Sequence, residues 1–290
     1  MKRLACAAAL LLALALPAVA QDVAITGTLA KIRATGKITV GVRDSAMPFS
    51  YKLPNGAPAG YAVDLCREIV EDISAELDGM PVAVAYRTVT AESRIGPVVS
   101  GDVDIECGST TRTRQRRQLV AFSPVFFVTG TKLLVSRESP IQSYRDLIGK
   151  TVVVTSGTTN EAAMHGLVDR LRLHINIVAA PDLPQALAML RAGKADAFAT
   201  DHVLLEGLVA TPEGRDYHVV GDYLSYEPYA LMYRKDDPTF GAVIEHSFER
   251  MAAAGRLSEL YSRWLTETLP TGERLNIPMS AMFRVLGQPD

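Results

Sequence analysis

The segment from Glu106 to Arg116 holds residues suited to binding a small anion. It reads Glu-Cys-Gly-Ser-Thr-Thr-Arg-Thr-Arg-Gln-Arg and includes the end of a strand-like run, Val103 to Cys107. Backbone N–H groups and hydroxyls at such a strand end, together with a guanidinium, can converge on a carboxylate. Nothing in the segment resembles a nucleophile with its base. The segment therefore predicts anion binding and not covalent catalysis.

The elements that must position this segment alternate between strand-like and helix-like patterns. The first half has expected strands at 38–42, 82–86 and 103–107, and helices that begin near Thr28 and Asp64. The second half has expected strands at 132–135, 151–155, 175–179 and 196–199, and helices at 160–171 and 183–191. An extended segment at 229–233 then returns to the first half, where two C-terminal helices follow. Such alternation is typical of α/β units with mostly parallel sheets.

Polar residues follow the expected strands at their carboxyl ends. Arg43, Ser109, Thr111, Thr158 and Asp201 all occupy such positions. Open α/β sheets bind ligands at this edge, where loops lead into helices. The spread of these residues over both halves predicts one ligand held between two units. Each hydroxyl taken alone would also suit a helix cap or a turn.

Residues 1–20 have the pattern of a secretory signal peptide. Lys2 and Arg3 precede an apolar run at 4–16, and Ala18-Val19-Ala20 predicts cleavage after Ala20. The apolar run is shorter than the about 20 residues that a membrane-spanning helix needs. We therefore expect an exported protein, and because Cys6 lies inside the apolar run, too early for a lipoprotein cleavage site, we expect no lipid anchor.

Charge and length limit the partners and the domain organisation. Loss of Lys2 and Arg3 with the signal lowers the basic count from 30 to 28 against 32 acidic residues, a formal charge of about −4. This balance argues against a nucleic-acid partner. The roughly 270 remaining residues suffice for two cores. We expect one lobe from 21–128 plus 231–290 and a second from 129–230.

Two cysteines remain after the expected cleavage. Cys66 lies on an expected helix and Cys107 at a strand end. A disulfide is possible in an exported protein if their Cα atoms lie within about 7 Å. Two buried free thiols are the alternative. We expect no metal site from two cysteines alone, and no cofactor.

A set of short motifs resembles the family 3 extracellular solute-binding proteins, and most of all their glutamate/aspartate-binding branch. The motifs are Gly41-Val-Arg43, Pro48-Phe-Ser-Tyr51, Gly60-Tyr61-X-X-Asp64, Ser93-Arg94-Ile95, Glu106-Cys-Gly-Ser-Thr-Thr111, Arg116, Phe122-Ser123 and Val152-Val-Val-Thr-Ser-Gly-Thr-Thr159. They cover nearly the whole mature chain. The resemblance implies a periplasmic-binding-protein fold, in which two α/β lobes are joined by two crossing hinge segments, near 128–131 and 226–231, around a ligand cleft. It also implies a monomeric periplasmic receptor without enzymatic activity that delivers an amino acid to an inner-membrane ABC permease.

The resemblance also implies roles for individual residues. Arg116 matches the arginine that clamps the ligand's α-carboxylate, and Asp201 matches the acid that accepts its α-ammonium. Arg43 and Arg94 match two arginines that hold the side-chain carboxylate of acidic amino acids. The hydroxylated residues expected at the ligand are Ser109, Thr111, Thr155, Thr158 and Thr159.

The sequence departs from the branch at two site positions. Ala91 stands where the branch has a serine, and Leu183 aligns with its histidine. His202, directly after Asp201, is the residue that could supply an imidazole instead. The resemblance therefore implies an acidic amino acid or a related dicarboxylate without deciding which one.

Other interpretations of these residues stay open at this point. Arg116 could be a solvated charge, because the other arginines of its run cannot all face one cleft. Arg43 could pair with Asp44, and Arg94 could cap a helix. The rings of Phe49, Tyr51 and Tyr61 could wall the ligand or belong to the core.

An enzyme on the same fold is the rival function. A dehydratase of the cyclohexadienyl or arogenate type would need a general acid, and Glu106 or Asp201 could be that acid. The sequence offers no second carboxylate with an evident partner role and no metal-ligand spacing.

Overall fold

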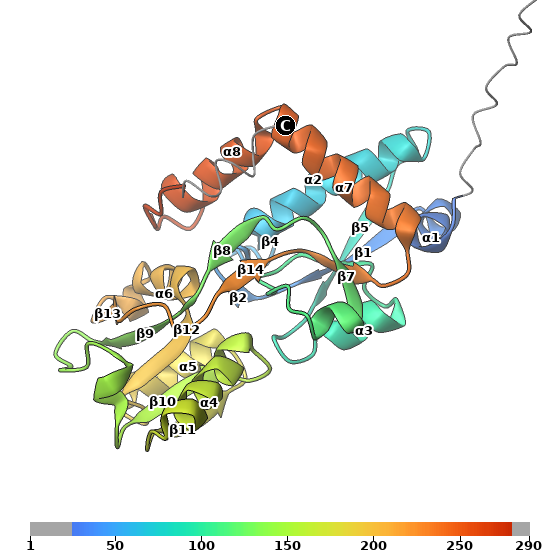
Figure 1. Cartoon of the computed structure of the whole chain (residues 1–290). Coiled ribbons are helices and arrows are strands. Elements are labelled where there is room, and N and C mark those ends of the chain that lie inside the picture. The colour runs from blue at the N-terminus through green and yellow to red at the C-terminus, as the bar shows by residue number, and fades with distance from the viewer. Residues whose placement is uncertain (1–24, 280–290) are drawn as a thin grey trace, which may run out of the picture.

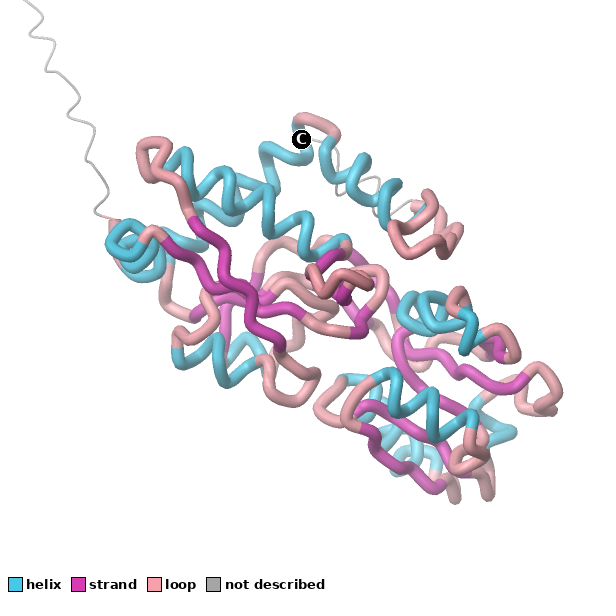
Figure 2. Tube along the Cα trace, turned by 180° about the vertical axis from the view of Figure 1, so that it is seen from behind, coloured by secondary structure: helices cyan, strands magenta, loops and turns pink. Residues whose placement is uncertain are grey.

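The computed structural model describes residues 25–279, so the expected signal at 1–20 lies outside the described part. The chain forms two bodies, each built around a five-stranded sheet with helices on its faces (Figure 1). The view from behind shows the bodies side by side, with the chain passing between them (Figure 2). This architecture confirms the predicted fold of two α/β lobes.

The first sheet combines strands from both ends of the chain. Its order is β5 (Ala83–Thr88), β1 (Lys37–Val42), β6 (Ile105–Glu106), β15 (Met232–Arg234) and β7 (Val120–Phe122). β1 runs parallel to β5 and β6, whereas β15 runs antiparallel to β6 and β7. A strand from the C-terminal part of the chain thus completes the sheet that the N-terminal part begins.

All five strands of the second sheet come from one stretch of the chain, residues 131–220. Its order is β11 (Asn176–Ala180), β10 (Thr151–Thr155), β12 (Ala197–Asp201), β9 (Thr131–Ser136) and β13 (Tyr217–Val220). β10 runs parallel to β11 and β12, and β9 runs antiparallel to β12 and β13. The interior strand β10 is a run of β-branched residues whose three valines are buried, as a strand covered on both faces requires.

Two antiparallel strands join the bodies. β8 (Phe127–Thr129) pairs with β14 (Glu227–Tyr229), and the next strands along the chain, β9 and β15, belong to different sheets. β14 lies within its predicted crossing segment, and β8 overlaps the other but begins one residue earlier, at Phe127. The crossing segments of the fold are therefore confirmed.

Helices cover both sheets (Figure 1). The first body carries α1 (Gly27–Thr35), α2 (Tyr61–Glu76), α3 (Ile95–Ser100), α7 (Pro238–Ala253) and α8 (Arg256–Tyr261), and the second carries α4 (Thr159–Leu171), α5 (Leu183–Arg191) and α6 (His202–Val209). Shorter elements are β2 (Ser45–Ala46), β3 (Ser50–Lys52), β4 (Pro58–Ala59), a π turn at Ser262–Thr266, and 3₁₀ turns at Arg116–Gln118, Tyr144–Leu147 and Pro212–Gly214. The small β2–β4 sheet and α3 were not predicted from the sequence.

Two predicted helix starts are wrong. The N-cap of α1 is Thr26 and not Thr28. Thr28 lies inside the helix, where its N–H and its Oγ1 donate to Asp237 Oδ2 at 2.8 and 2.6 Å. α2 begins at Tyr61, so Asp64 lies within its first turn.

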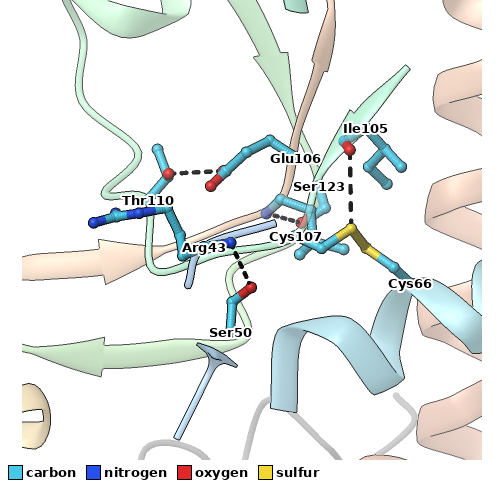
Figure 3. Close-up of a disulfide and its surroundings, with 9 residues drawn as sticks. Arg43, Ser50, Cys66, Ile105, Glu106, Cys107, Thr110 and Ser123 are labelled. Carbon is cyan, nitrogen blue, oxygen red and sulfur yellow. Dashed lines mark hydrogen bonds between the residues drawn. A yellow bond between two sulfur atoms is a disulfide. The ribbon is translucent and has the colours of Figure 1, made fainter. Parts of the chain in front are cut away.

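Cys66 on α2 and Cys107, directly after β6, form a disulfide with Cα atoms 6.3 Å apart (Figure 3). The alternative of two free thiols is therefore wrong. The cross-link spans a sequence separation of 41, which restricts the unfolded chain by roughly 3–4 kcal/mol in the chain-entropy view. It also fixes the start of the loop that carries Ser109 and Thr111.

Candidate functional site

A small pocket of about 20 Å³ lies between the two bodies. The first body lines it with Arg43, Ala91, Arg94, Ser109 and Thr111, and the second with Thr155, Thr158, Thr159, Asn160, Leu183, Thr200, Asp201 and Leu204. Eight of the ten residues singled out in the sequence are in this lining. The exceptions are Arg116 and His202.

The lining residues stand where strands end and helices begin. Arg43 follows β1 directly, and Asp201 is the last residue of β12. Thr158 is the N-cap of α4, and its hydroxyl donates to the backbone carbonyl of Thr155 at 2.7 Å. Arg94 directly precedes α3. This placement is the edge at which open α/β sheets bind ligands.

Arg43 is buried, and its guanidinium has neither a hydrogen bond nor an ion pair within residues 25–279. Its backbone N–H donates to Ser50 Oγ at 2.9 Å (Figure 3). Asp44 pairs with Lys52 instead, at 2.8 Å, so the suggested Arg43–Asp44 pair does not form. Burial, and then the nearby cation of Arg94, lower the pKa of Arg43 to about 10.

Arg94 is 3% exposed and reaches inward toward the loop after β6. Its Nη1 donates to Thr110 Oγ1 at 2.8 Å and to the carbonyl of Ser109 at 3.3 Å, while its Nε finds no partner in the described part of the chain. Burial lowers the pKa of Arg94. The side chain makes no capping bond to α3.

Glu106 is the fully buried carboxylate beneath these arginines. Its Oε2 accepts from Thr110 Oγ1 at 2.7 Å (Figure 3), and its charge opposes the effect of burial on the pKa of both Arg43 and Arg94. Glu106 does not line the pocket. It is therefore poorly placed to act as a general acid on a bound molecule.

Arg116 is the buried member of the arginine run, with 8% of its surface exposed, whereas Arg114 and Arg117 are exposed. Its Nη1 donates to the carbonyl of Thr111 at 3.0 Å, and its Nη2 reaches across to the carbonyl of Gly157 at 3.3 Å. Burial, followed by Arg94, lowers its pKa to about 10. The idea that Arg116 is a solvated charge is therefore wrong.

Asp201 provides a buried acceptor on the second body. Its Oδ1 accepts from Asn160 Nδ2 at 2.9 Å, and its Oδ2 accepts from Tyr229 Oη. Burial, and then the neighbouring carboxylate of Glu227, raise the pKa of Asp201 to about 7.

His202 does not line the pocket. Its Nδ1 lies 2.9 Å from Tyr223 Oη and its Nε2 lies 3.0 Å from Glu206 Oε1. The structure does not bring its imidazole to the position that the aligned histidine would occupy. Leu183 and Ala91, the two departures from the branch, do line the pocket.

The three rings considered as ligand walls belong to the core. Phe49, Tyr51 and Tyr61 are buried, and none lines the pocket. Phe49 packs edge-on against Phe127 and Tyr229 of the crossing strands, with centroids 5.0 and 5.1 Å apart.

Four polar residues at the site were missed from the sequence, and one of them, Thr200, lies in the pocket lining beside Asp201. Asn160 is in the pocket lining, Tyr229 donates to Asp201, and Glu227 contacts Thr111 and Thr159. Glu227 and Tyr229 both lie on crossing strand β14. The sequence feature that could have revealed Glu227 is its charge, since the rest of the predicted crossing segment is largely apolar.

The described chain offers no other obvious chemistry. Within residues 25–279 no group of His, Cys, Asp or Glu side chains is arranged to hold a metal ion. No helix in the same range is long and apolar enough to cross a membrane.

Comparisons with known proteins give consistent matches. The model of the bacterial extracellular solute-binding proteins, family 3, matches residues 38–267. The L-glutamate/L-aspartate-binding protein of Pseudomonas aeruginosa is 40% identical over 94% of this chain and 91% of its own. The glutamate/aspartate import solute-binding protein of Salmonella typhimurium is 35% identical over 89% of this chain and 87% of its own. The relatives are named as binding proteins, in agreement with the expectation of a non-enzymatic protein.

Solved structures match the same arrangement. An ancestral amino acid-binding protein, AncCDT-1, described as a precursor of cyclohexadienyl dehydratase, has a TM-score of 0.73 and 26% identity, covering 82% of this chain and 99% of its own. An ancestral arginine-binding protein bound to arginine has a TM-score of 0.71 and 26% identity, covering 79% and 98%.

Proposed function

This chain belongs to the bacterial extracellular solute-binding proteins of family 3, and from that premise we propose that it captures an acidic amino acid, such as glutamate or aspartate, for an ABC importer. One observation carries the choice of ligand. Two buried arginines, Arg43 and Arg94, line a pocket whose other wall holds Asp201, and a third buried arginine, Arg116, bridges the two bodies beside it through the carbonyl of Gly157. The names of the glutamate/aspartate-binding relatives support the same choice.

The charges of the pocket suit a zwitterionic dicarboxylate. Arg116, together with the N–H groups at the start of α4, would bind the α-carboxylate, and Asp201 would accept from the α-ammonium. Arg43 and Arg94 would hold the side-chain carboxylate. Desolvated ionic groups need such paired partners to offset the loss of water.

Hydroxyl groups would complete the contacts. Ser109, Thr111, Thr155, Thr158 and Thr159 all line the pocket. Thr155 Oγ1 is buried and without a partner in the described residues, so it is free to donate to an anion.

Selection would rest on uncompensated charge. A neutral or basic amino acid would leave the guanidinium of Arg43, which has no protein partner in residues 25–279, buried beside Arg94 without an anion. Leaving a buried charged donor unpaired is more unfavourable than losing a neutral contact.

Binding would be coupled to closure of two lobes. We assign 21–128 plus 231–290 to one lobe and 129–230 to the other, hinged at the crossing strands. The interface between the two bodies, called the seam below, is already bridged by two contacts. Arg116 contacts Gly157 across it, and Thr111 contacts Thr159 at 3.2 Å. A ligand that bridges both sides would stabilise this closed state by its differential affinity. A monomeric periplasmic receptor would then present the closed form to an inner-membrane permease.

Calorimetric titration tests the proposal. Glutamate or aspartate should release heat and bind with a Kd near or below micromolar, about −8 kcal/mol. Binding of glutamine, asparagine or arginine with no binding of either acid would overturn the assignment of Arg43 and Arg94. Prephenate and arogenate serve as tests of the dehydratase alternative, since loss of either substrate would replace the transport function.

Affinity for the acidic amino acid is expected to fall as the pH drops below about 7. The free Asp201 carboxyl has a pKa of about 7, set by burial and Glu227 against the opposing bonds from Tyr229 and Asn160 and the charge of Arg94. A bound ammonium would lower this pKa, so binding displaces a proton below about pH 7 and weakens by up to about tenfold per pH unit. Titrations between about pH 5.5 and about pH 8 check this slope, and Asp201→Asn should remove it.

Gly157→Ala is expected to weaken ligand binding by roughly 10- to 100-fold, since an added methyl would obstruct the closed seam. A Cβ on Gly157 would lie 2.7 Å from the Cα of Glu92 on the opposite body. The substitution would also displace the carbonyl that accepts from Arg116. Calorimetry with glutamate measures the loss.

Gly149→Ala is the matched control. Gly149 has a φ of 75°, close to the 72° of Gly157, and a Cβ there would meet nothing within 4 Å. Both substitutions introduce the same backbone strain of about 1 kcal/mol, while Gly157→Ala alone affects the seam. Equal losses of affinity in the two variants would contradict the proposed closure contact.

A further inference from the structure

Glu227 is a buried carboxylate in the middle of the seam. It lies on crossing strand β14 and is 2% exposed. Its Oε2 accepts from Thr111 Oγ1 at 2.7 Å and from Thr159 Oγ1, and its Oε1 accepts from Ser225 Oγ at 2.6 Å. No arginine or lysine pairs with it in the described structure. Hydroxyls alone therefore satisfy this carboxylate.

These bonds fix the direction of the two threonine hydroxyls. A hydroxyl has one hydrogen to donate, and a carboxylate can only accept. Thr111 and Thr159 both give that hydrogen to Glu227, and both line the pocket. Their oxygens therefore offer lone pairs, and no hydrogen, to a molecule in the pocket.

The same polarity continues along the wall to Asp201. Ser225 donates to Glu227, so the 2.7 Å contact between Ser225 Oγ and Thr131 Oγ1 must have Thr131 as the donor. Asn160 Nδ2 then donates to Thr131 Oγ1 at 2.8 Å and to Asp201 Oδ1 at 2.9 Å. In this row of hydrogen bonds, every hydroxyl hydrogen is therefore donated to another protein atom.

We propose that Glu227 is a positioning residue that turns the Thr111 and Thr159 hydroxyls into acceptors, so that with Asp201 they form a site selective for an ammonium group. Three acceptors match the three hydrogens of a primary ammonium. The inference rests on the proposed function and deepens it. In this arrangement the hydroxyls of the two threonines serve the ligand's ammonium and not its carboxylate.

The position of Glu227 also explains why the effect would depend on closure. Thr111 comes from the loop after β6 in the first body, and Thr159 is the first residue of α4 in the second. Glu227 holds both, so the acceptor pair is complete when the bodies meet. Recognition of the ammonium and closure would thus share one carboxylate.

Glu227→Gln with two ligands tests the inference. The amide can donate to the threonine oxygens, which frees their hydrogens to face the pocket. Calorimetry should show glutamate binding weakened by about 30-fold, as expected for lost bonds to a charged group. Binding of 2-oxoglutarate, which has an oxygen where glutamate has an ammonium, should be unchanged within about threefold or become tighter. The ratio of the two affinities is the deciding quantity.

A purely structural role would weaken both ligands alike, and that result would overturn the inference. Glu138→Gln, an exposed residue of the second body, controls for the substitution itself. If Glu227→Gln fails to fold by circular dichroism, Thr159→Val tests the same idea, since it removes one acceptor. It should weaken glutamate by about tenfold and spare 2-oxoglutarate. An equal effect on both ligands would refute the assignment.

Failure of the proposed function has a different signature. If the unmodified protein binds a neutral or basic amino acid and no acid, the acidic-ligand proposal fails. The Glu227 inference is then tested with that amino acid and its 2-oxo analogue. Glu227→Gln should also move the pH midpoint of amino-acid binding below about 7, because Glu227 is the charge that helps raise the pKa of Asp201.

Discussion

Replacing Arg116 with alanine is expected to weaken binding of every amino acid by roughly 1000-fold, toward the limit of calorimetric detection. The α-carboxylate is common to all amino acids, and Arg116 is the cation assigned to it. Its guanidinium is buried and held between the carbonyls of Thr111 and Gly157, so the protein itself fixes its direction when the two bodies are closed. A preorganised, desolvated cation contributes more to binding than a flexible exposed one.

Exposed neighbours in the same run provide the controls. Arg114→Ala and Arg117→Ala remove the same charge from solvent-exposed positions, and each should change affinity by less than about threefold. Titrations with glutamate and glutamine distinguish the role of Arg116 from side-chain specificity. If Arg116→Ala lost glutamate binding and kept glutamine binding, Arg116 would belong to the side-chain subsite and its assignment would be wrong.

The sequence predicted the elements with regular patterns well. Leu65, Ile69 and Ile73 repeat every four residues, and all three are buried on α2. The predicted start of α2 was wrong because the first turn of this helix depends on tertiary contacts. The N–H of Tyr61 donates to the carbonyl of Pro48 at 2.8 Å, so a distant loop, and not a capping side chain, begins the helix.

The hydrophobic periodicity of the sequence does not show which polar side chains reach the site. Burial of Arg116 beside exposed Arg114 and Arg117 requires a carbonyl from the other body, which no local pattern reveals. The family resemblance supplied that position. His202 shows the opposite failure: Asp201 ends β12 and lines the pocket, whereas His202 begins α6 and its ring contacts Tyr223 and Glu206 instead.

Glu227 was missed because candidates were sought where strands lead into helices. It lies instead inside a crossing strand, where the sequence predicts an extended, largely apolar segment. Its partners, Thr111 and Thr159, are far from it in sequence and approach it through the meeting of the two bodies. Such a contact follows from topology and cannot be derived from spacing.

Arg43→Met is expected to abolish the preference for acidic amino acids, lowering glutamate affinity by roughly 1000-fold while changing glutamine affinity by less than about tenfold. Arg43 tests charge more directly than Arg94 does. Arg94 also holds Thr110 and the carbonyl of Ser109, so its loss would disturb the loop that contacts any ligand. The Arg43 guanidinium makes no hydrogen bond in residues 25–279.

The ligand-free stability of Arg43→Met gives an independent check of the same argument. Burial and the cation of Arg94 lower the pKa of Arg43, which means that the charged form is disfavoured where it lies. Removing that charge should leave the melting temperature unchanged or raise it, because functional sites often retain groups that destabilise the free protein. Arg43→Lys, which keeps the charge without the planar fork, should retain part of the glutamate preference. A methionine variant that still prefers glutamate would show that Arg43 does not read the side-chain carboxylate.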